Sequence, residues 1–266
     1  MVIDFHTHCF PNKISNKAID ILSKKSGNIL PEHMGDVDSL RSKIKQMGAD
    51  MAVVQNISTN PKQQSSVNDY AIRINQFENL VSFGSVHPDS PDALAELERI
   101  KESGLKGIKF HPDYQGFFVD EKKMIPLYEK AAELGLITLF HSGVDIGYPD
   151  PIHCTPKALR SVLHYFYGAP VVAAHMGGWL CWAGVLEHLV GEDIYFDTAY
   201  SHAKMPPEWA LEIINSHPKQ KILLGSDMPW SRTDNEISFI KSLGLSTEHE
   251  NMILGENAEK LLGLNK

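Results

Sequence analysis

Short apolar runs, most of them rich in β-branched residues, recur along the whole chain. Near-continuous runs of this kind are typical of strands buried in a parallel sheet, whereas a strand with one wet face alternates apolar and polar residues. The eight runs cover residues 2–6, 51–56, 81–86, 106–111, 137–141, 171–175, 194–198 and 222–227.

Helical patterns separate these runs. Two of them begin at capping sequences, Ser90-Pro91-Asp92 and Thr155-Pro156, and a third ends at Gly135, a residue suited to a helix C-terminus. The main expected helices span residues 38–48, 90–103, 121–135, 155–167, 207–216 and 234–243.

Strands that alternate with helices predict βαβ units with right-handed crossovers. Eight such units in about 250 residues match a closed (β/α)8 barrel of the TIM type. An open doubly wound sheet is the alternative, but the first strand is not followed by the Gly-rich turn usual there. We therefore predict one α/β barrel domain over residues 1–266, with an inserted helix and lid at 12–37 and an extra C-terminal helix at 247–263.

Polar side chains end every predicted strand. In a barrel these strand ends meet at one face, where the active sites of such barrels lie. The residues concerned are His6 and His8, Gln55 and Asn56, His87, His111, His141, His175, Asp197 and Asp227.

His6 and His8 are two positions apart on one strand, so their side chains point the same way. Neutral imidazole is the commonest metal ligand, and His141 and Asp227 from other strand ends can complete a site. Three histidines and one carboxylate suit Zn²⁺, with Mn²⁺ or Fe²⁺ as alternatives. Hydrogen bonding within the core explains any one of these histidines, but explains the whole set poorly.

Other residues at this face are candidates for substrate binding. Lys109 and His111 share one face of the fourth strand, and Lys109 is a substrate cation, a carboxylated bridge between two metals, or the partner of an acid such as Asp145. Arg232 is a candidate carboxylate anchor. The predicted substrate-binding set is Lys109, His111, Tyr114, Gln115, Asp145, His153, Trp230 and Arg232.

The net charge limits the classes of partner that we expect the protein to bind. The chain has 25 Lys and Arg residues against 33 Asp and Glu, a net charge of −8, which argues against nucleic acid and anionic membranes as partners. Three widely spaced cysteines and a start without a signal-peptide pattern suit the cytoplasm. We expect a small-molecule substrate, and a homodimer if the C-terminal helix is exposed.

These motifs together resemble the amidohydrolase superfamily, in the amidohydrolase-related branch that also contains aminocarboxymuconate-semialdehyde decarboxylase. The resemblance spans the chain and rests on His6-x-His8, His141 in LFHSG, His175 in AHMGG and Asp227 in GSDMPW. It implies a distorted (β/α)8 barrel with His6, His8, His141 and Asp227 as metal ligands, and His175 beside the reacting group.

One position departs from the two-metal members of this superfamily, which carry a carboxylated Lys or a Glu at the fourth strand. Lys109 lies in a GIKFHP context that does not match that bridge, so one tightly bound metal is expected and a second is left open.

The expected reaction is hydrolysis of an amide, ester or lactone, because a bound metal lowers the pKa of water toward about 7. Asp227 would move the proton and His175 would polarise the carbonyl group. The first alternative is non-oxidative decarboxylation of a small aromatic or unsaturated carboxylic acid by the same metal. The second is a non-catalytic metal-binding barrel.

Overall fold

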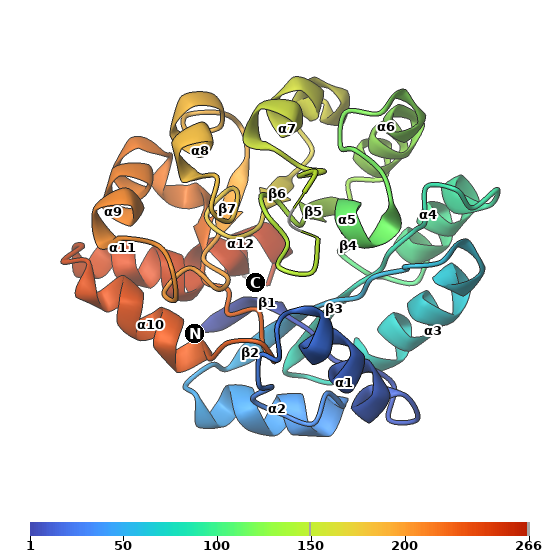
Figure 1. Ribbon diagram of the computed structural model, residues 1–266, viewed down its shortest axis with the longest axis horizontal. Helices are drawn as coiled ribbons and strands as arrows, with labels where there is room; N and C mark the ends of the chain where they lie inside the picture. Colours follow the sequence, from blue (N-terminus) through green and yellow to red (C-terminus); the bar gives the residue numbers. More distant parts are fainter. Residues whose placement is uncertain (149, 265–266) are drawn as a thin grey trace.

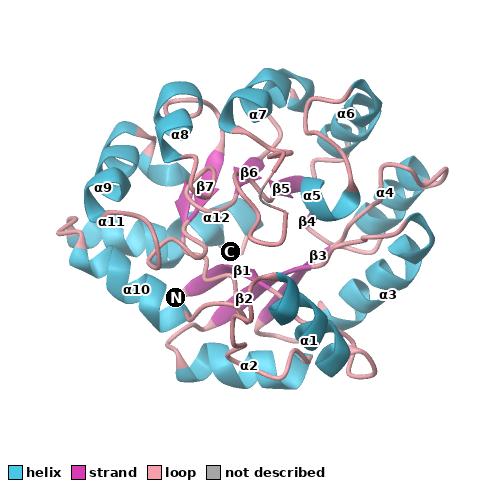
Figure 2. Cartoon of the chain, in the orientation of Figure 1, coloured by secondary structure: helices cyan, strands magenta, loops and turns pink. Residues whose placement is uncertain are grey.

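Eight parallel strands form an inner ring and most of the helices lie outside it in the computed structural model, which describes residues 1–148 and 150–264 (Figures 1 and 2). All eight predicted strands are present, and most are shorter than predicted. They are β1 (Ile3–Thr7), β2 (Met51–Gln55), β3 (Leu80–Phe83), β4 (Gly107–Phe110), β5 (Ile137–Phe140), β6 (Val171–Ala173), β7 (Tyr195–Asp197) and β8 (Ile222–Leu223).

The ring is closed by backbone hydrogen bonds. Strands β1 to β3 form one parallel sheet and β4 to β8 another. At one junction Lys109 N–H donates to the Gly84 carbonyl at 2.8 Å, and at the other Phe5 N–H donates to the Leu224 carbonyl at 2.7 Å. This closure confirms the predicted (β/α)8 barrel.

Helices follow the strands in the order that βαβ units require. The cap predicted at Thr155 is present, since its side chain accepts a hydrogen bond from Ala158 N–H. The outer helices are α2 (Val37–Gln46), α3 (Gln64–Ile74), α4 (Ala93–Glu102), α6 (Ile125–Glu133), α7 (Pro156–Val162), α8 (Trp182–His188), α9 (Pro207–Ser216) and α10 (Thr233–Ser242), and a short helix α5 (Pro112–Gln115) follows β4.

Helix α3 has no counterpart among the predicted helices, because its buried face is partly polar. Asn68 is fully buried, and its amide donates to the Ser85 carbonyl at 2.9 Å and to Glu96 at 2.7 Å. Two of its inward side chains, Gln64 and Asn68, are amides, so the apolar pattern that would reveal the helix is interrupted.

The lid predicted at residues 12–37 contains helix α1 (Ser15–Lys25), which lies at the mouth of the barrel beside β2 and α2 (Figure 1). Several of its side chains line the central cavity, so the insertion borders the site as expected.

The apolar side of the predicted C-terminal helix is buried, so the condition set for a homodimer through this helix is not met. The predicted single helix is α11 (Thr247–Asn251), a π-helical turn and α12 (Asn257–Leu262). Ala258 and Leu262 are buried among residues of the barrel interior such as Ile3 and Leu223. This helix therefore packs against the barrel, and its apolar face offers no basis for a dimer.

The weakly charged stretch at residues 168–186 is divided between β6, a loop and the start of α8. None of the helices in the described part of the chain has the length and hydropathy that crossing a bilayer requires.

Candidate active site

A cavity of about 740 Å³ opens at the carboxyl ends of the strands. The histidines and aspartates that the sequence placed at the strand ends lie within β1 or β7 or one to four residues after their strands, and the barrel brings most of them to one cavity, whose lining includes neither His87 nor Asp197. The predicted site residues that line the cavity are His6, His8, Lys109, His111, Tyr114, His141, Asp145, His175, Asp227 and Trp230.

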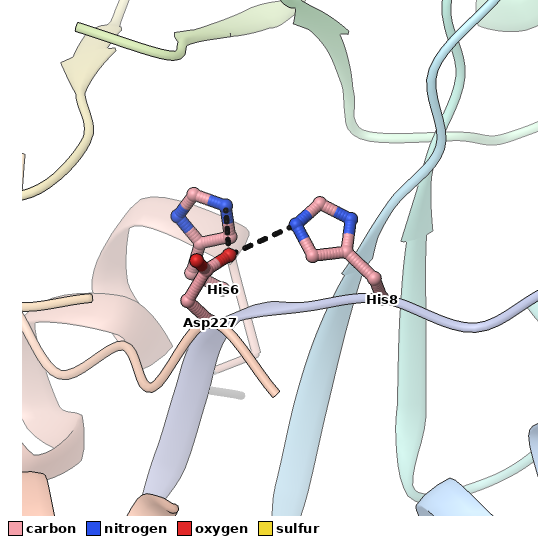
Figure 3. Close-up of side chains that lie close together, drawn as sticks. All are labelled: His6, His8 and Asp227. Carbon is pink, nitrogen blue, oxygen red and sulfur yellow. Dashed lines mark hydrogen bonds and ion pairs between the residues drawn. The ribbon is translucent and has the colours of Figure 1, made fainter. Parts of the chain in front are cut away.

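Three of these residues form a compact group. The Nε2 atom of His8 lies 3.1 Å from Oδ1 of Asp227, and Nε2 of His6 lies 3.5 Å from the same oxygen (Figure 3). The two imidazoles come from β1 and the residue after it, whereas Asp227 comes from the loop after β8. One nitrogen from each ring and one carboxylate oxygen thus lie within 4.8 Å of one another.

The hydrogen bonds on the far sides of the two rings fix which nitrogen carries the proton. Nδ1 of His8 lies 2.9 Å from the Gln55 carbonyl, and Nδ1 of His6 lies 2.8 Å from Oδ2 of Asp197. The carbonyl and the carboxylate only accept, so a neutral ring donates from Nδ1 and has its lone pair on Nε2, which in His6 also lies 3.3 Å from Nζ of Lys109. Two lone pairs and a carboxylate oxygen therefore face each other, an arrangement that fits a divalent cation.

Charge states at this group agree with that donor set. Burial, with a contribution from the Lys109 cation, holds the pKa of His6 well below its usual value, so the ring stays neutral. Metal binding requires the neutral form of such a ring.

The backbone is strained at two of the site residues. Asp227 has a φ of 69° and His175 a φ of 61°, both in the left-handed region that non-glycine residues avoid. Such conformations cost about 1–3 kcal/mol each and are found mostly at functional sites. At Asp227 the turn is held by its N–H, which donates to the His6 carbonyl at 2.8 Å.

His141 lies outside the first group and pairs with His175. Nδ1 of His175 donates to the Ala199 carbonyl at 2.9 Å, and its Nε2 lies 3.1 Å from Nδ1 of His141. His141 must therefore donate from Nδ1, which leaves its buried Nε2 without a hydrogen-bond partner in the described residues. The structure thus groups three of the four predicted ligands, and the role of His141 as a ligand stays a prediction.

A second cluster joins His141 to His111 and Asp145. The rings of His111 and His141 are stacked, with centroids 4.2 Å apart and an interplanar angle of 4°. Lone pairs of parallel rings lie in parallel planes, so they cannot converge on one ion. Nε2 of His111 lies 3.5 Å from Oδ2 of Asp145, and burial holds the pKa of both imidazoles well below its usual value, so the cluster is two neutral stacked rings beside a carboxylate.

Lys109 is a buried cation in the cavity wall, with only 1% of its surface exposed. Its Nζ lies 3.3 Å from Nε2 of His6, and no carboxylate of the described residues lies within 4.0 Å of it. The alternative of a salt bridge to Asp145 is therefore not realised. Burial lowers the pKa of Lys109 to about 8.

Three residues that were predicted to bind substrate do not line the cavity: Gln115, His153 and Arg232. The amide of Gln115 donates to the carbonyls of Ser58 and Val86 at 2.9 and 2.8 Å, so it braces the loops beneath.

The imidazole of His153 is hydrogen-bonded to the Asp113 carboxyl group, with Nδ1 and Oδ1 2.8 Å apart. Arg232 binds Asp234 at 2.7 Å and Glu32 at 3.1 Å, so it joins the lid to the loop after β8 and is not placed to anchor a substrate carboxylate.

Asp197 is the main residue whose role the sequence did not reveal. It ends β7, as the pattern of polar strand ends indicated, but its partners are set by the fold. One oxygen contacts His6, and the other accepts the backbone N–H of His175 at 2.9 Å. Asp197 thus orients residues from β1 and β6 together.

Comparison with known proteins adds to this geometry. No curated protein sequence matches the chain significantly. An uncharacterised Tim-barrel protein from Bordetella bronchiseptica shares the fold with a TM-score of 0.76 and 18% identity, over 98% of both chains.

Two decarboxylases share the fold as well. A dihydroxybenzoic acid decarboxylase from Polaromonas sp. JS666, with bound manganese and the inhibitor 2-nitroresorcinol, has a TM-score of 0.73 and 14% identity over 100% of this chain and 97% of that one. A 5-carboxyvanillate decarboxylase from Sphingomonas paucimobilis has a TM-score of 0.66 and 14% identity over 98% of both chains. The amidohydrolase family model matches residues 3–264. The chain therefore belongs to the amidohydrolase family of enzymes.

Proposed function

We propose that the protein is a metal-dependent decarboxylase of a small aromatic or unsaturated carboxylic acid. The observation that carries the proposal is the Lys109 cation, buried in the cavity without a carboxylate partner among the described residues. A buried charge without a partner is costly, so an anionic ligand is its natural complement. The two similar decarboxylases support loss of a carboxyl group over the hydrolysis that the sequence favoured.

Nε2 of His6, Nε2 of His8 and Oδ1 of Asp227 would hold the divalent cation, and Nε2 of His141 is the further nitrogen that the family resemblance assigns to it. Zn²⁺ and Mn²⁺ both accept a set of nitrogen and carboxylate ligands. When bound, the cation supplies positive charge that stabilises negative charge on substrate oxygens.

The other cavity residues would bind and orient the acid. The Lys109 ammonium group would pair with the substrate carboxylate, an interaction strengthened by the low dielectric of the buried site. Trp179, Tyr200 and Trp230 line the cavity and offer aromatic faces to an unsaturated or aromatic body.

Loss of CO₂ leaves an electron pair on carbon, and that carbon must take up one proton. We assign this proton to Oδ2 of Asp227, which makes no hydrogen bond to the described residues, whereas both nitrogens of His175 are engaged. The carboxylate would take the proton from water in the cavity and pass it to carbon, and the hydroxide left behind would leave with the CO₂ as bicarbonate. His175 then serves to position His141, and not to polarise a carbonyl.

The test uses purified protein loaded with Mn²⁺ or Zn²⁺ and a panel of hydroxybenzoic and enoic acids in D₂O. We expect metal-dependent CO₂ release with deuterium at the vacated carbon. Asp227→Asn should abolish both, while Asp193→Asn, a change at an exposed carboxylate, should not. Ester or lactone hydrolysis without CO₂ would contradict the proposal, and so would binding of the acids without turnover.

A further inference from the structure

The two ends of the cavity differ in chemistry. One end holds the group of His6, His8 and Asp227 with Lys109 beside it. Away from that end, the cavity is lined by a wall of aliphatic side chains from helix α1 and the residues that flank it. This aliphatic wall consists of Ile14, Ala18, Ile21, Leu22 and Ile29.

The aliphatic wall has no covering partner in the described structure. Residues 14, 18, 21 and 22 follow helical spacing and lie along one face of the helix. Ile14 and Ile21 line the cavity, yet they are 50% and 52% exposed. The residues of α1 that are buried, Ser15 and Ile19, lie on the neighbouring face. The helix therefore turns one apolar face to the barrel and leaves a second one open to the cavity.

The size of the cavity exceeds what a one-ring acid needs. A cavity of about 150 Å³ holds benzene, and the cavity here has a volume of about 740 Å³, roughly five times as much. A one-ring acid paired with Lys109 would leave most of the space along α1 to water. Water gains little from aliphatic surface, so the shape favours a ligand with an apolar body.

The polar groups limit where that apolar body can lie. Lys25, near the end of α1, is held over the Tyr148 ring, with Nζ 3.5 Å from the ring centroid. Tyr114 and Asp145 also line this side of the cavity. Lys25, Tyr114 and Asp145 thus give the cavity a polar rim, and the aliphatic wall is the part of the lining that can receive an apolar body.

We propose that the substrate is an amphiphilic monocarboxylic acid, whose carboxylate pairs with Lys109 and whose apolar substituent of several carbons lies along the aliphatic wall of α1. This proposal rests on the proposed function only for the identity of the head group. It names the substrate class that the same site would take.

The test measures binding, and not turnover, with 4-alkylbenzoates as probes. Dissociation constants of benzoate and its 4-ethyl, 4-butyl and 4-hexyl derivatives are measured calorimetrically with metal-loaded protein. Each buried methylene should tighten binding roughly fourfold, so the constants should fall steeply along the series. A series with constant affinity, or no binding by any member, would overturn the proposal.

Variants locate the effect on α1. Ala18→Trp fills the wall and Ile21→Asn makes it polar, so each should reduce the ratio of the benzoate to the 4-hexylbenzoate dissociation constant. Lys17→Trp, at an exposed position of the same helix, should leave that ratio unchanged. If all three variants keep the wild-type ratio, the alkyl chain lies elsewhere and the proposal is contradicted.

Light scattering measures the oligomeric state and so tests whether a second copy of the chain, and not a ligand, covers the aliphatic wall. A dimer that Ile21→Asn dissociates, together with constant affinity along the series, would mean that a second copy covers α1 and would overturn the proposal. CO₂ release from short acids, together with constant affinity along the 4-alkylbenzoate series, would support the proposed function and contradict the proposed substrate class. Steep affinity without CO₂ release from any acid would support the ligand class and contradict the decarboxylase.

Discussion

Oδ2 of Asp197 lies 2.8 Å from Nδ1 of His6, and this contact fixes which nitrogen of the imidazole faces the cavity. Because a carboxylate only accepts hydrogen bonds, the ring donates from Nδ1 and keeps the lone pair on Nε2 for a cation. A buried residue that touches neither cation nor substrate thus sets the state of a ligand.

Asp197→Asn should weaken metal binding while the fold persists. An amide NH₂ placed opposite Nδ1 would force the proton of His6 to Nε2 and block the lone pair. We expect the affinity for Zn²⁺ or Mn²⁺ to fall by about 10–100-fold, as for other changes behind metal ligands. Calorimetric titration of metal-free protein measures this. The exposed Asp193→Asn should bind metal like the wild type, and an unchanged affinity in Asp197→Asn would contradict the role given to Asp197.

Gly225 provides the space into which His6 is packed. A Cβ atom at this position would lie 2.9 Å from Cβ of His6, which is closer than real contacts allow. Gly225→Ala should therefore displace His6 and lower metal affinity, with a loss of stability of about 1–3 kcal/mol from overpacking. Metal titration and thermal unfolding measure the two effects. Gly184→Ala, whose Cβ would meet Pro156 at an ordinary 3.4 Å, is the matched control.

Lys109 and Arg232 are the two candidate carboxylate anchors, and they differ in whether a carboxylate of the protein already pairs with them. Lys109→Met should weaken benzoate binding to the metal-loaded protein by about tenfold or more, because a charged hydrogen bond is lost. Arg232→Met should change it by no more than about twofold, since the guanidinium already binds Asp234 and Glu32. A larger loss in the Arg232 variant would reverse this assignment.

The pair of His202 and Glu236 predicts how stability depends on pH. Nδ1 of His202 lies 2.7 Å from Oε1 of Glu236, which is fully buried. Burial raises the pKa of Glu236 to about 7, and the hydrogen bond with Glu236 raises the pKa of His202 above its usual value. Both groups hold protons more tightly when folded, so their stabilisation is complete at low pH and is lost as pH rises through the folded pKa values.

The wild-type melting temperature should therefore fall more steeply than that of Glu236→Gln from about pH 5 to about pH 8. Thermal scans at several pH values compare the two slopes. The exposed Glu248→Gln should keep the wild-type slope. Parallel curves for Glu236→Gln and the wild type would show that this pair does not titrate in the assigned range.

Local patterns were enough to predict the barrel and the residues that meet at its mouth. The near-continuous apolar runs located all eight strands, and polar strand ends located His6, His8, His175 and Asp227. These features depend on residues close together in the sequence and on one rule of barrel geometry.

Features that depend on distant partners were not predictable in this way. Arg232 was proposed as an anchor because its charge was visible, but its partner Glu32 is 200 residues away. The hydrogen bond of His141 with His175 and its stacking on the His111 ring also depend on residues from other strands. The sequence shows which residues are present, but their hydrogen-bond partners are set only by the folded chain.

The central claim is that the group of His6, His8 and Asp227 holds the cation on which loss of the carboxyl group depends. The most direct measurement is CO₂ release from the acid panel by metal-free protein titrated with Mn²⁺, compared with His8→Ala. The account predicts that CO₂ release rises with metal occupancy to a plateau and is absent in His8→Ala, which should bind the ion more weakly. Full CO₂ release by metal-free protein, or by His8→Ala without bound metal, would contradict it.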